Sequence, residues 1–420
     1  MQNYAILSKK GEGTFSEVMV GVCVRTHART AIKCMKKKFE SLEDVYKLPE
    51  IQALRRLAGH PNIIRLHDVL FEGRRLALVM ELMDMNLYEA IKDRQSFIPE
   101  NRIVSWVHQL FQALAFMHEN QLFHRDVKPE NLLLRGDCLK LGDLGSCSRI
   151  DVEGPPFTEY ISTRWYRAPE CLLTSGFYGF KMDIWAAGCV LYEVATLHPL
   201  FPGKNELDQI HKIHAILGTP SDRILGEFRS LPGEHLGHIS FQPMRGSGFG
   251  RKLQHCSSQL VSLLSSTLTY DPTNRPTAFD CLRCGLFSRL GPPVRLTKIG
   301  NRLSDPQAWH PSSDNTFETP PASFTPVVSP PDVPPFPNSR IVPALHLSNN
   351  AGLNKRGSRS VAPKPQRSEG KSGFLTHRIR SKIPQPHVTT RKPNQARYRN
   401  FSRIYRIDLQ SDERAPQTHR

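Results

Sequence analysis

The sequence predicts an α+β protein in which a small strand-rich part is followed by a larger helical part and then by a long tail. Three observations support this division. Residues 4–36 alternate apolar and polar side chains around glycines, and a period of two is typical of β-strands. Between residues 103 and 117, apolar side chains recur every three or four positions, which is the spacing of an amphipathic helix. Residues 291–420 show no sustained periodicity and are rich in Pro, Ser, Asn and Arg, which predicts disorder.

Positive charge is concentrated in this tail. Residues 291–420 hold 19 of the 33 prolines, and their 21 lysines and arginines against 8 acidic residues account for +13 of the net charge of +17. A basic run over residues 355–406 is interleaved with aromatic residues and is suited to binding nucleic acid, anionic lipid or an import receptor. A solvated positive tail explains the same residues at least as well. The proline-rich run 330–337 can form a polyproline II helix that docks into an SH3-type groove, although proline-rich linkers are commoner.

The cysteines predict a reducing, intracellular environment. All nine precede residue 285, and only Cys281 and Cys284 have a regular spacing. No second ligand pair accompanies them, so we interpret them as small apolar residues of a helix rather than a zinc site. Free thiols and the lack of a signal-peptide pattern predict that the chain stays inside the cell. The longest apolar run, residues 184–197, contains Glu193 and is too short to cross a bilayer, so no transmembrane segment is expected.

The first expected elements are a strand, a tight loop and a second strand, followed by a third strand. Gly11 and Gly13 interrupt the alternating pattern, and Ala31-Ile-Lys33 lies in the third strand. A glycine pair of this kind more often marks only a hairpin, so its interpretation depends on the motifs found further along the chain.

A helix is expected at residues 49–57, where apolar residues recur every three positions. Glu50 lies on this helix, and in isolation it would be interpreted as a solvated side chain. Pro49 directly precedes it, lacks an amide donor and is tolerated only in the first turn of a helix. The helix therefore either begins at Pro49 or is kinked there.

Three later segments complete the expected framework. Residues 76–83 form an apolar run that predicts a buried strand, and the amphipathic helix at residues 103–117 comes after it. Residues 181–197 are apolar nearly all round, which is typical of a helix buried in the centre of a domain.

The stretch from residue 122 to residue 145 carries the polar groups best suited to phosphate chemistry. Asp126, Asn131 and Asp143 lie in polar segments between short apolar runs, which predicts a small hairpin that presents them on one rim. Carboxylate and amide oxygens are hard ligands of the kind that Mg²⁺ takes alongside substrate phosphates. Lys128 adds positive charge where a phosphoryl group would pass.

The order of these residues is specific. His124-Arg-Asp126-Val-Lys-Pro-Glu-Asn131, followed by Asp143-Leu-Gly145, resembles the catalytic loop and the metal-binding motif of eukaryotic protein kinases. A polar turn that caps a hairpin would explain Asp126 or Asn131 alone, but not eight ordered positions together with the second motif.

The resemblance implies the bilobal protein kinase fold. It covers residues 4–287, with a small β-rich N-lobe at about 4–82 and a larger helical C-lobe at about 86–287. Residues 288–420 form the Pro-rich, basic tail, on which the resemblance is silent.

The resemblance also implies chemical roles. Asp126 would orient the substrate hydroxyl and accept its proton, with Lys128 beside it, and Asn131 and Asp143 would hold Mg²⁺ against the phosphates of ATP. Lys33 would pair with the α- and β-phosphates.

The rest of the implied nucleotide site lies in the N-lobe and the hinge. Glu50 would hold the phosphate-binding lysine in place, and backbone groups near Glu81 and Met83 would bond adenine, with Met80 gating the pocket behind it. Ser16 replaces the third glycine of the family pattern. The residues implied to contact ATP are Gly11, Gly13, Ser16, Val18, Ala31, Lys33, Glu81, Met83 and Leu133.

A spacing of 27 residues separates Asp143 from Glu170, which is the length expected of a kinase activation loop. Within it, Thr158-Glu-Tyr160 resembles the dual phosphorylation site of mitogen-activated protein kinases, and residues 161–167 resemble the branch of cyclin-dependent, mitogen-activated and MAK-type kinases. The resemblance implies a serine/threonine kinase whose protein substrates carry Ser or Thr followed by Pro, regulated by an upstream kinase or by autophosphorylation. It also implies a cytoplasmic and nuclear location, with the cilium suggested by MAK-type kinases.

Phosphate on Tyr160 would meet Arg164 and Arg167 and form charge-assisted hydrogen bonds with them. For Thr158 only Arg125 is present, because two arginines that related kinases place near this phosphate are absent. We therefore expect the phosphate on Tyr160 to contribute more to activation. The residues expected to regulate the enzyme are Thr158, Tyr160, Arg125, Arg164 and Arg167.

Two scaffold contacts are implied as well. Asp183 would anchor the backbone of the catalytic loop, and Arg275 would form a buried ion pair with Glu170. Neither residue is expected to take part in the chemistry.

Two other classes of function stay open at this point. A kinase-fold scaffold without turnover would be favoured by loss of Lys33, Asp126 or Asp143, and none of them is lost. Only Pro49 favours it. A nucleic-acid or microtubule adaptor that acts through the basic tail would bind polyanions with a steep dependence on salt.

Overall fold

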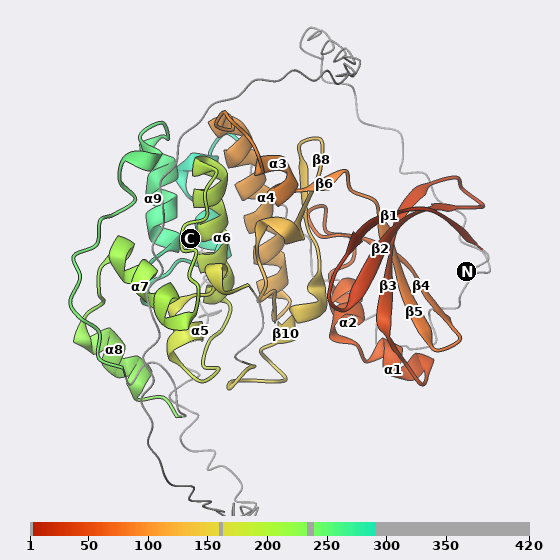
Figure 1. Cartoon of the computed structure of the whole chain (residues 1–420), viewed down its shortest axis with the longest axis horizontal. Coiled ribbons are helices and arrows are strands. Elements are labelled where there is room, and N and C mark those ends of the chain that lie inside the picture. Colours follow the sequence, from red (N-terminus) through yellow and green to blue (C-terminus); the bar gives the residue numbers. More distant parts are fainter. Residues whose placement is uncertain (1–2, 159–162, 233–238, 291–420) are drawn as a thin grey trace, which may run out of the picture. The chain divides into compact units, whose positions relative to one another are not determined.

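The computed structural model describes residues 3–158, 163–232 and 239–290. A strand-rich lobe and a helical lobe follow one another along the chain, as Figure 1 shows in red to orange and in orange through yellow to green. This is the α+β, bilobal architecture that the sequence predicts. Tyr160 and the tail from residue 291 lie outside the described residues.

The N-lobe is built on an antiparallel five-stranded sheet in the order β1-β2-β3-β5-β4. Ile32 packs with Ala77 and Val79 on one face of this sheet, so its neighbours Ala31 and Lys33 point to the other face. The strand predicted at residues 76–83 ends earlier, at Glu81, because the chain then turns into the short strand β6. The strands are β1 (Tyr4–Glu12), β2 (Ser16–Cys23), β3 (Arg29–Lys38), β4 (Leu66–Glu72) and β5 (Arg75–Glu81).

Two short helices, α1 (Leu42–Tyr46) and α2 (Pro49–Arg56), accompany the sheet (Figure 1). Leu48 is the extended residue before α2, and Pro49 occupies the first turn of the helix. Of the two arrangements that the sequence allows, the structure therefore has the first, a helix that begins at the proline. The missing amide of proline is harmless there, because the first amides of a helix have no intrahelical partner.

The C-lobe surrounds α6 (Lys181–Thr196), in which nearly every residue is buried. This burial explains why its sequence is apolar nearly all round. Helix α4 (Glu100–Glu119) packs against α6 and buries one stripe of its surface, as its periodicity predicts. The other described helices are α3 (Leu87–Ile91), α5 (Pro169–Leu173), α7 (Glu206–Leu217), α8 (Asp222–Arg229), α9 (Ser258–Thr267) and α10 (Ala278–Leu282), with 3-10 turns η1 (Pro129–Asn131), η2 (Leu144–Ser146), η3 (Arg164–Tyr166), η5 (Gly250–Leu253) and η6 (Gly285–Phe287).

Two small sheets frame the loop that contains Asp126. In the hairpin of β8 and β9, Leu132 pairs with Leu141, so the residues just outside it, Asn131 and Asp143, lie on one rim as predicted. The strands of these sheets are β6 (Met85–Asn86), β8 (Leu132–Arg135) and β9 (Cys138–Leu141) in one, and β7 (Leu122–Phe123) and β10 (Ser148–Arg149) in the other.

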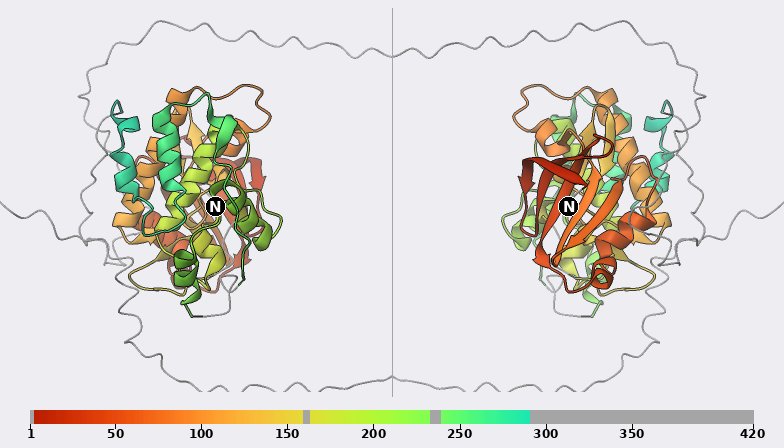
Figure 2. Two further views of the ribbon diagram at one scale, coloured as in Figure 1. Left: turned by 90° about the vertical axis from the view of Figure 1, so that its left-hand side faces the viewer. Right: turned by 90° about the vertical axis from the view of Figure 1, so that its right-hand side faces the viewer.

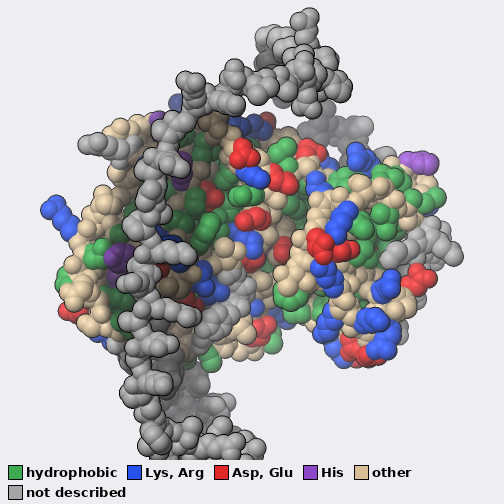
Figure 3. Space-filling view, in the orientation of Figure 1, with side chains coloured by type: hydrophobic (Ala, Val, Ile, Leu, Met, Phe, Trp, Pro, Cys, Tyr) green, Lys and Arg blue, Asp and Glu red, His purple; other side chains and the backbone are tan. Residues whose placement is uncertain are grey.

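One continuous apolar core runs from α2 and the N-lobe sheet into the helical lobe. The helices lie in front in the left view of Figure 2, and the sheet lies in front in the right view. Basic and acidic side chains are interspersed over the N-lobe face seen in Figure 3. Within the described ranges, no helix is both long enough and apolar enough to cross a membrane.

Candidate active site

The loop after β7 is held by the first turn of α6. The buried carboxylate of Asp183 accepts hydrogen bonds from the backbone amides of His124 and Arg125 at 2.8 and 2.9 Å. His118, near the end of α4, bonds to the same carboxylate at 2.9 Å. Asp183 thus makes the backbone contacts that the sequence predicts, whereas the contribution of His118 was not predicted.

Asp126 is oriented by two neighbours. Nζ of Lys128 and Nδ2 of Asn131 donate to Oδ2 of Asp126 at 2.8 and 3.0 Å, and Nδ2 of Asn131 also donates to the Asp126 carbonyl at 2.8 Å. Both side-chain contacts use the same carboxylate oxygen. Among the described residues no donor bonds to Oδ1 of Asp126, so this oxygen is left to accept a hydrogen bond from a substrate hydroxyl.

Asn131 and Asp143 form a set of ligands that suits Mg²⁺. The amide nitrogen of Asn131 is bonded to Asp126, and its amide oxygen has no donor in the described part of the chain. A Cβ at Gly145 would lie 3.4 Å from Oδ1 of Asp143, so glycine leaves space beside this carboxylate. No group of three His, Cys, Asp or Glu side chains among the described residues could hold a metal by itself. Two oxygen ligands fit a Mg²⁺ site that nucleotide phosphates complete.

Lys33 joins three segments in one cluster of ion pairs. Its Nζ lies 2.6 Å from Oε1 of Glu50 on α2 and 2.9 Å from Oδ1 of Asp143 after β9. Burial opposes the charged form of Lys33, but the two carboxylates outweigh it and raise the pKa of the ammonium. Lys33 is therefore charged at neutral pH, as pairing with phosphates requires.

Glu50 occupies the second position of α2, directly after Pro49. The amides at a helix N-terminus carry partial positive charge and favour a nearby carboxylate. Burial nevertheless raises the pKa of Glu50, and Lys33 opposes this rise. The ion pair with Lys33 is thus the contact that holds this carboxylate in its buried position.

The glycine turn between β1 and β2 is tighter than predicted. Gly11 lies inside β1 and Ser16 is the first residue of β2, because the two strands stay paired as far as Glu12 and Glu17. The amide of Gly13 donates to the carbonyl of Ser16 at 2.8 Å and closes the turn. Of the predicted phosphate-covering positions, only Gly13 therefore lies in the turn itself.

The pairing of strands β2, β3 and β5 brings together other residues that are predicted to contact the nucleotide. Val18 pairs with Lys33 across β2 and β3, and Ala31 pairs with Met80 across β3 and β5. Leu133 lies on β8, where a Cβ at Gly142 would stand 3.0 Å from its Cδ1.

The side chain of Glu81 ties the hinge to two other segments. Its Oε1 accepts a hydrogen bond from the amide of Arg65 at 2.7 Å and forms an ion pair with Nζ of Lys140 on β9 at 2.8 Å. Met83, two residues further on, is buried. Oε1 of Glu81 is therefore used within the protein, and the amide of Glu81 donates to the carbonyl of Arg65 at 3.1 Å. The resemblance implies that adenine bonds to backbone groups near Glu81 and Met83.

The described part of the activation segment places one arginine at Thr158. Nη1 of Arg125 lies 3.3 Å from Oγ1 of Thr158. Arg149, the other basic residue early in this segment, pairs with Asp151 at 2.7 Å instead. A phosphate on Thr158 would thus begin with a single arginine contact.

Arg164 and Arg167 lie where the activation segment enters the C-lobe. Nη1 of Arg164 donates to the carbonyl of Lys204 at 3.3 Å, and its Nε is buried without a partner among the described residues. Nη1 of Arg167 lies 3.5 Å from Oε1 of Glu206 on α7. Tyr160, whose phosphate these arginines are predicted to bind, is outside the described residues.

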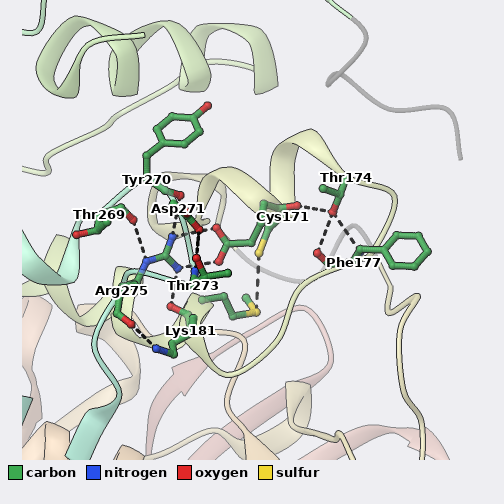
Figure 4. A network of polar contacts seen from close by, with 11 residues as sticks. Cys171, Thr174, Phe177, Lys181, Thr269, Tyr270, Asp271, Thr273 and Arg275 are labelled. Carbon is green, nitrogen blue, oxygen red and sulfur yellow. Dashed lines mark hydrogen bonds and ion pairs between the residues drawn. The ribbon is translucent and has the colours of Figure 1, made fainter. Parts of the chain in front are cut away.

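Glu170 and Arg275 form the buried ion pair that the resemblance implies. Figure 4 labels Arg275 in the surrounding network of polar contacts. The two contacts between guanidinium and carboxylate measure 2.7 and 3.0 Å, and both side chains are at most 1% exposed. Arg275 also donates to the carbonyls of Lys181 and Thr269 at 2.7 and 3.1 Å. The pair fastens α5, and the activation segment that leads into it, to the start of α6.

A second buried contact was not predicted. The hydroxyl of Tyr166 donates to Oε2 of Glu193 at 2.7 Å, which links η3 to α6. Burial raises the pKa of Glu193 to about 7. An acidic residue inside an apolar run signals a buried polar partner, but nothing in the sequence identifies Tyr166 as that partner.

The known proteins that this chain resembles are protein kinases, and the similarity extends over most of the described residues. A family profile described as "Protein kinase domain" matches residues 4–287. MAPK/MAK/MRK overlapping kinase of Homo sapiens is 52% identical over 289 residues, which cover 68% of this chain and 68% of the human protein. Cyclin-dependent kinase F-4 of Oryza sativa subsp. japonica is 40% identical over 302 residues, 71% of this chain and 65% of the rice protein. Serine/threonine-protein kinase MAK of Rattus norvegicus is 36% identical over 347 residues, 82% of this chain and 53% of the rat protein.

Proposed function

The chain belongs to the protein kinase family and is a serine/threonine kinase of the cyclin-dependent, mitogen-activated and MAK branch, and from this premise we propose that it is proline-directed and switched through Thr158-Glu-Tyr160. Membership of the family implies ATP as the phosphate donor and usually Mg²⁺ as the metal. The observation that supports an active enzyme best is the oriented Asp126, with one carboxylate oxygen held and the other available.

The proposed chemistry follows from this geometry. A substrate hydroxyl bonds to Oδ1 of Asp126, which aims the oxygen at the γ-phosphorus and takes its proton. As the new oxygen–phosphorus bond forms, the bond between the γ-phosphorus and the β–γ bridging oxygen breaks, and ADP leaves. Lys128 lies at the same carboxylate and stabilises negative charge on the transferred phosphoryl group. Lys33 holds the α- and β-phosphates. Asn131 and Asp143 would hold Mg²⁺, and the metal would supply positive charge that neutralises the phosphates.

Proline direction rests on the resemblance of residues 161–167 and on the role proposed for Arg167. We propose that Arg167 holds this segment so that it offers no hydrogen-bond acceptor to the substrate residue after the phosphorylated one. An amide left without a partner costs free energy, and proline has no amide hydrogen. Proline at that position therefore avoids a cost that every other residue incurs.

Two peptides that differ only in Ser-Pro against Ser-Ala test this proposal. Since an unpaired buried amide costs at least about 1 kcal/mol, we expect kcat/KM to be roughly 10-fold higher for the Ser-Pro peptide. A Thr-Pro peptide serves as the control and is expected to stay a substrate. Equal values for the Pro and Ala peptides would refute proline direction.

Phosphorylation of Tyr160 is proposed to activate more than phosphorylation of Thr158. The resemblance places Arg164 and Arg167 near the first phosphate and Arg125 near the second. Arg164 and Arg167 already contact Lys204 and Glu206, so the first phosphate would share these arginines with their present partners. We expect Tyr160→Phe to lower kcat/KM of the phosphorylated enzyme by about 10-fold or more, and Thr158→Ala to lower it by less than about 3-fold. The reverse order would contradict the proposal.

The location in cytoplasm, nucleus or cilium stays a prediction from the sequence, as do SH3-type and polyanion contacts of the tail.

A further inference from the structure

Phe157, the residue before Thr158, is buried although it belongs to the activation segment. Its side chain is 6% exposed, and its ring centroid lies 5.1 Å from that of Phe123 and 5.4 Å from that of Tyr178. Phe123 is itself fully buried in β7, two residues before Arg125. The activation segment is thus fastened to the core of the C-lobe at a point between β10 and η3.

Gly176 makes this contact possible. The amide of Phe157 donates to the carbonyl of Gly176 at 2.8 Å. A Cβ at Gly176 would lie 2.1 Å from the carbonyl oxygen of Phe157, and the φ of Gly176 is +81°. Both the positive φ and the close approach of two backbones require glycine. The turn that carries Gly176 is closed by Oγ1 of Thr174, which accepts from the amide of Phe177 at 3.1 Å (Figure 4).

The same cluster holds Thr158 at two further points. The hydroxyl of Tyr178 donates to the carbonyl of Thr158 at 2.5 Å, and Arg125 contacts the hydroxyl of Thr158. Arg125 also donates from Nε to the carbonyl of Ser146 at 2.6 Å, and its guanidinium lies 5.7 Å from the centre of the Phe123 ring. These contacts join the catalytic loop to the activation segment, and none of them requires a phosphate on Thr158.

We propose that Phe157 is a positioning residue whose burial against Gly176 holds the activation segment in its substrate-binding arrangement before Thr158 is phosphorylated. The inference deepens the proposed function and rests on it for the small role of the Thr158 phosphate. The fixed point at Phe157 divides the chain between β10 and η3 into two shorter loops, and each shorter loop loses less entropy when its ends are held. An anchor of this kind does for the segment what a phosphate on Thr158 would otherwise do.

Replacement of Gly176 by alanine tests this proposal, with Gly154→Ala as the matched control. Both glycines have a positive φ, but a Cβ at Gly154 meets nothing within 4 Å, whereas one at Gly176 meets the backbone of Phe157. Gly154 also lies in the activation segment, three residues before Phe157. The two variants therefore share the backbone strain and differ in the collision. The second variant is Phe157→Leu, which replaces the ring by a smaller aliphatic side chain and creates no collision.

The measurement is KM for a basic test protein and KM for ATP, with the full chain and unphosphorylated Thr158. A misplaced binding segment can cost one to two orders of magnitude, so we expect Gly176→Ala to raise KM for the test protein by about 10-fold and to leave KM for ATP within about 2-fold. Phe157→Leu is expected to raise the first value by a smaller factor. Gly154→Ala, which strains the same segment without the collision, is expected to raise it by less than about 3-fold.

Two results would overturn the proposal. One is a Gly176→Ala enzyme with the same two KM values as Gly154→Ala. The other is a proportional rise in both KM values, which would indicate general damage rather than a displaced segment. The phosphorylation sites of the test protein need not be followed by proline, so the two glycine variants can be compared whether or not the enzyme prefers proline. The absence of a proline preference would therefore refute the proposed function without affecting this test.

Discussion

Asp126→Asn is expected to lower kcat by about 10³-fold while KM for ATP stays within about 2-fold. Asparagine keeps the size of the side chain and can still accept hydrogen bonds from Lys128 and Asn131, so the loop keeps its shape. It cannot take the proton of the substrate hydroxyl. The measurement is the transfer of labelled phosphate from ATP-Mg²⁺ to a basic test protein, with nucleotide binding followed separately.

Asp137→Asn is the control for this variant. Asp137 lies in the turn between β8 and β9, and its side chain is 82% exposed beside Arg102. Exposed ion pairs contribute little, so kcat is expected to change by less than about 2-fold. Equal kcat values for the Asp126 and Asp137 variants would exclude Asp126 as the residue that orients and deprotonates the hydroxyl.

Glu170→Gln is expected to reduce the free energy of unfolding by about 3–5 kcal/mol, because it leaves the charge of Arg275 buried and without a counter-ion. Neither side chain is more than 1% exposed, and the two contacts between them are short. Trp185 lies 5.2 Å from the guanidinium, measured to the ring centroid, so its fluorescence reports on this region. Urea unfolding followed by tryptophan fluorescence measures the change.

The matched control is Glu40→Gln, which breaks an ion pair with Arg74 at the surface. The side chains of that pair are 73% and 55% exposed, and its loss is expected to change the free energy of unfolding by no more than about 0.5 kcal/mol. A cost at Glu170 as small as that at Glu40 would show that the ion pair does not stabilise the fold.

Most of the helices and strands that carry the site could be predicted, because their patterns involve residues close together in the sequence. The helices α4 and α6 follow from periodicity, and the rim of Asn131 and Asp143 follows from a short hairpin whose register is set by two neighbouring strands. The ion pair of Glu170 and Arg275 spans 105 positions, and the spacing alone would not have found it. The resemblance to protein kinases supplied it.

The contacts that were missed join residues whose meeting depends on the whole fold. The pairs of Phe157 with Gly176, Tyr166 with Glu193, and Glu81 with Lys140 bring distant segments together. An isolated glycine in a loop carries no sequence signal of its φ, and a hinge glutamate looks like any exposed acidic residue. The tight loop after β1 was predicted, and only its boundaries differ, because strand pairing continues through Gly11 and Glu12 on one side and Ser16 and Glu17 on the other.

Pro49 has one more consequence, and it concerns partners. The residue before a proline is disfavoured in helical conformation, and the proline ring clashes with a carbonyl one turn earlier. Leu48 is accordingly extended, with φ −61° and ψ 129°. Extension of α2 toward its N-terminus would place Pro49 inside the helix at a cost of about 3 kcal/mol. A regulatory protein that binds at this end therefore meets less resistance when it shifts the whole helix, and Glu50 with it, than when it lengthens the helix.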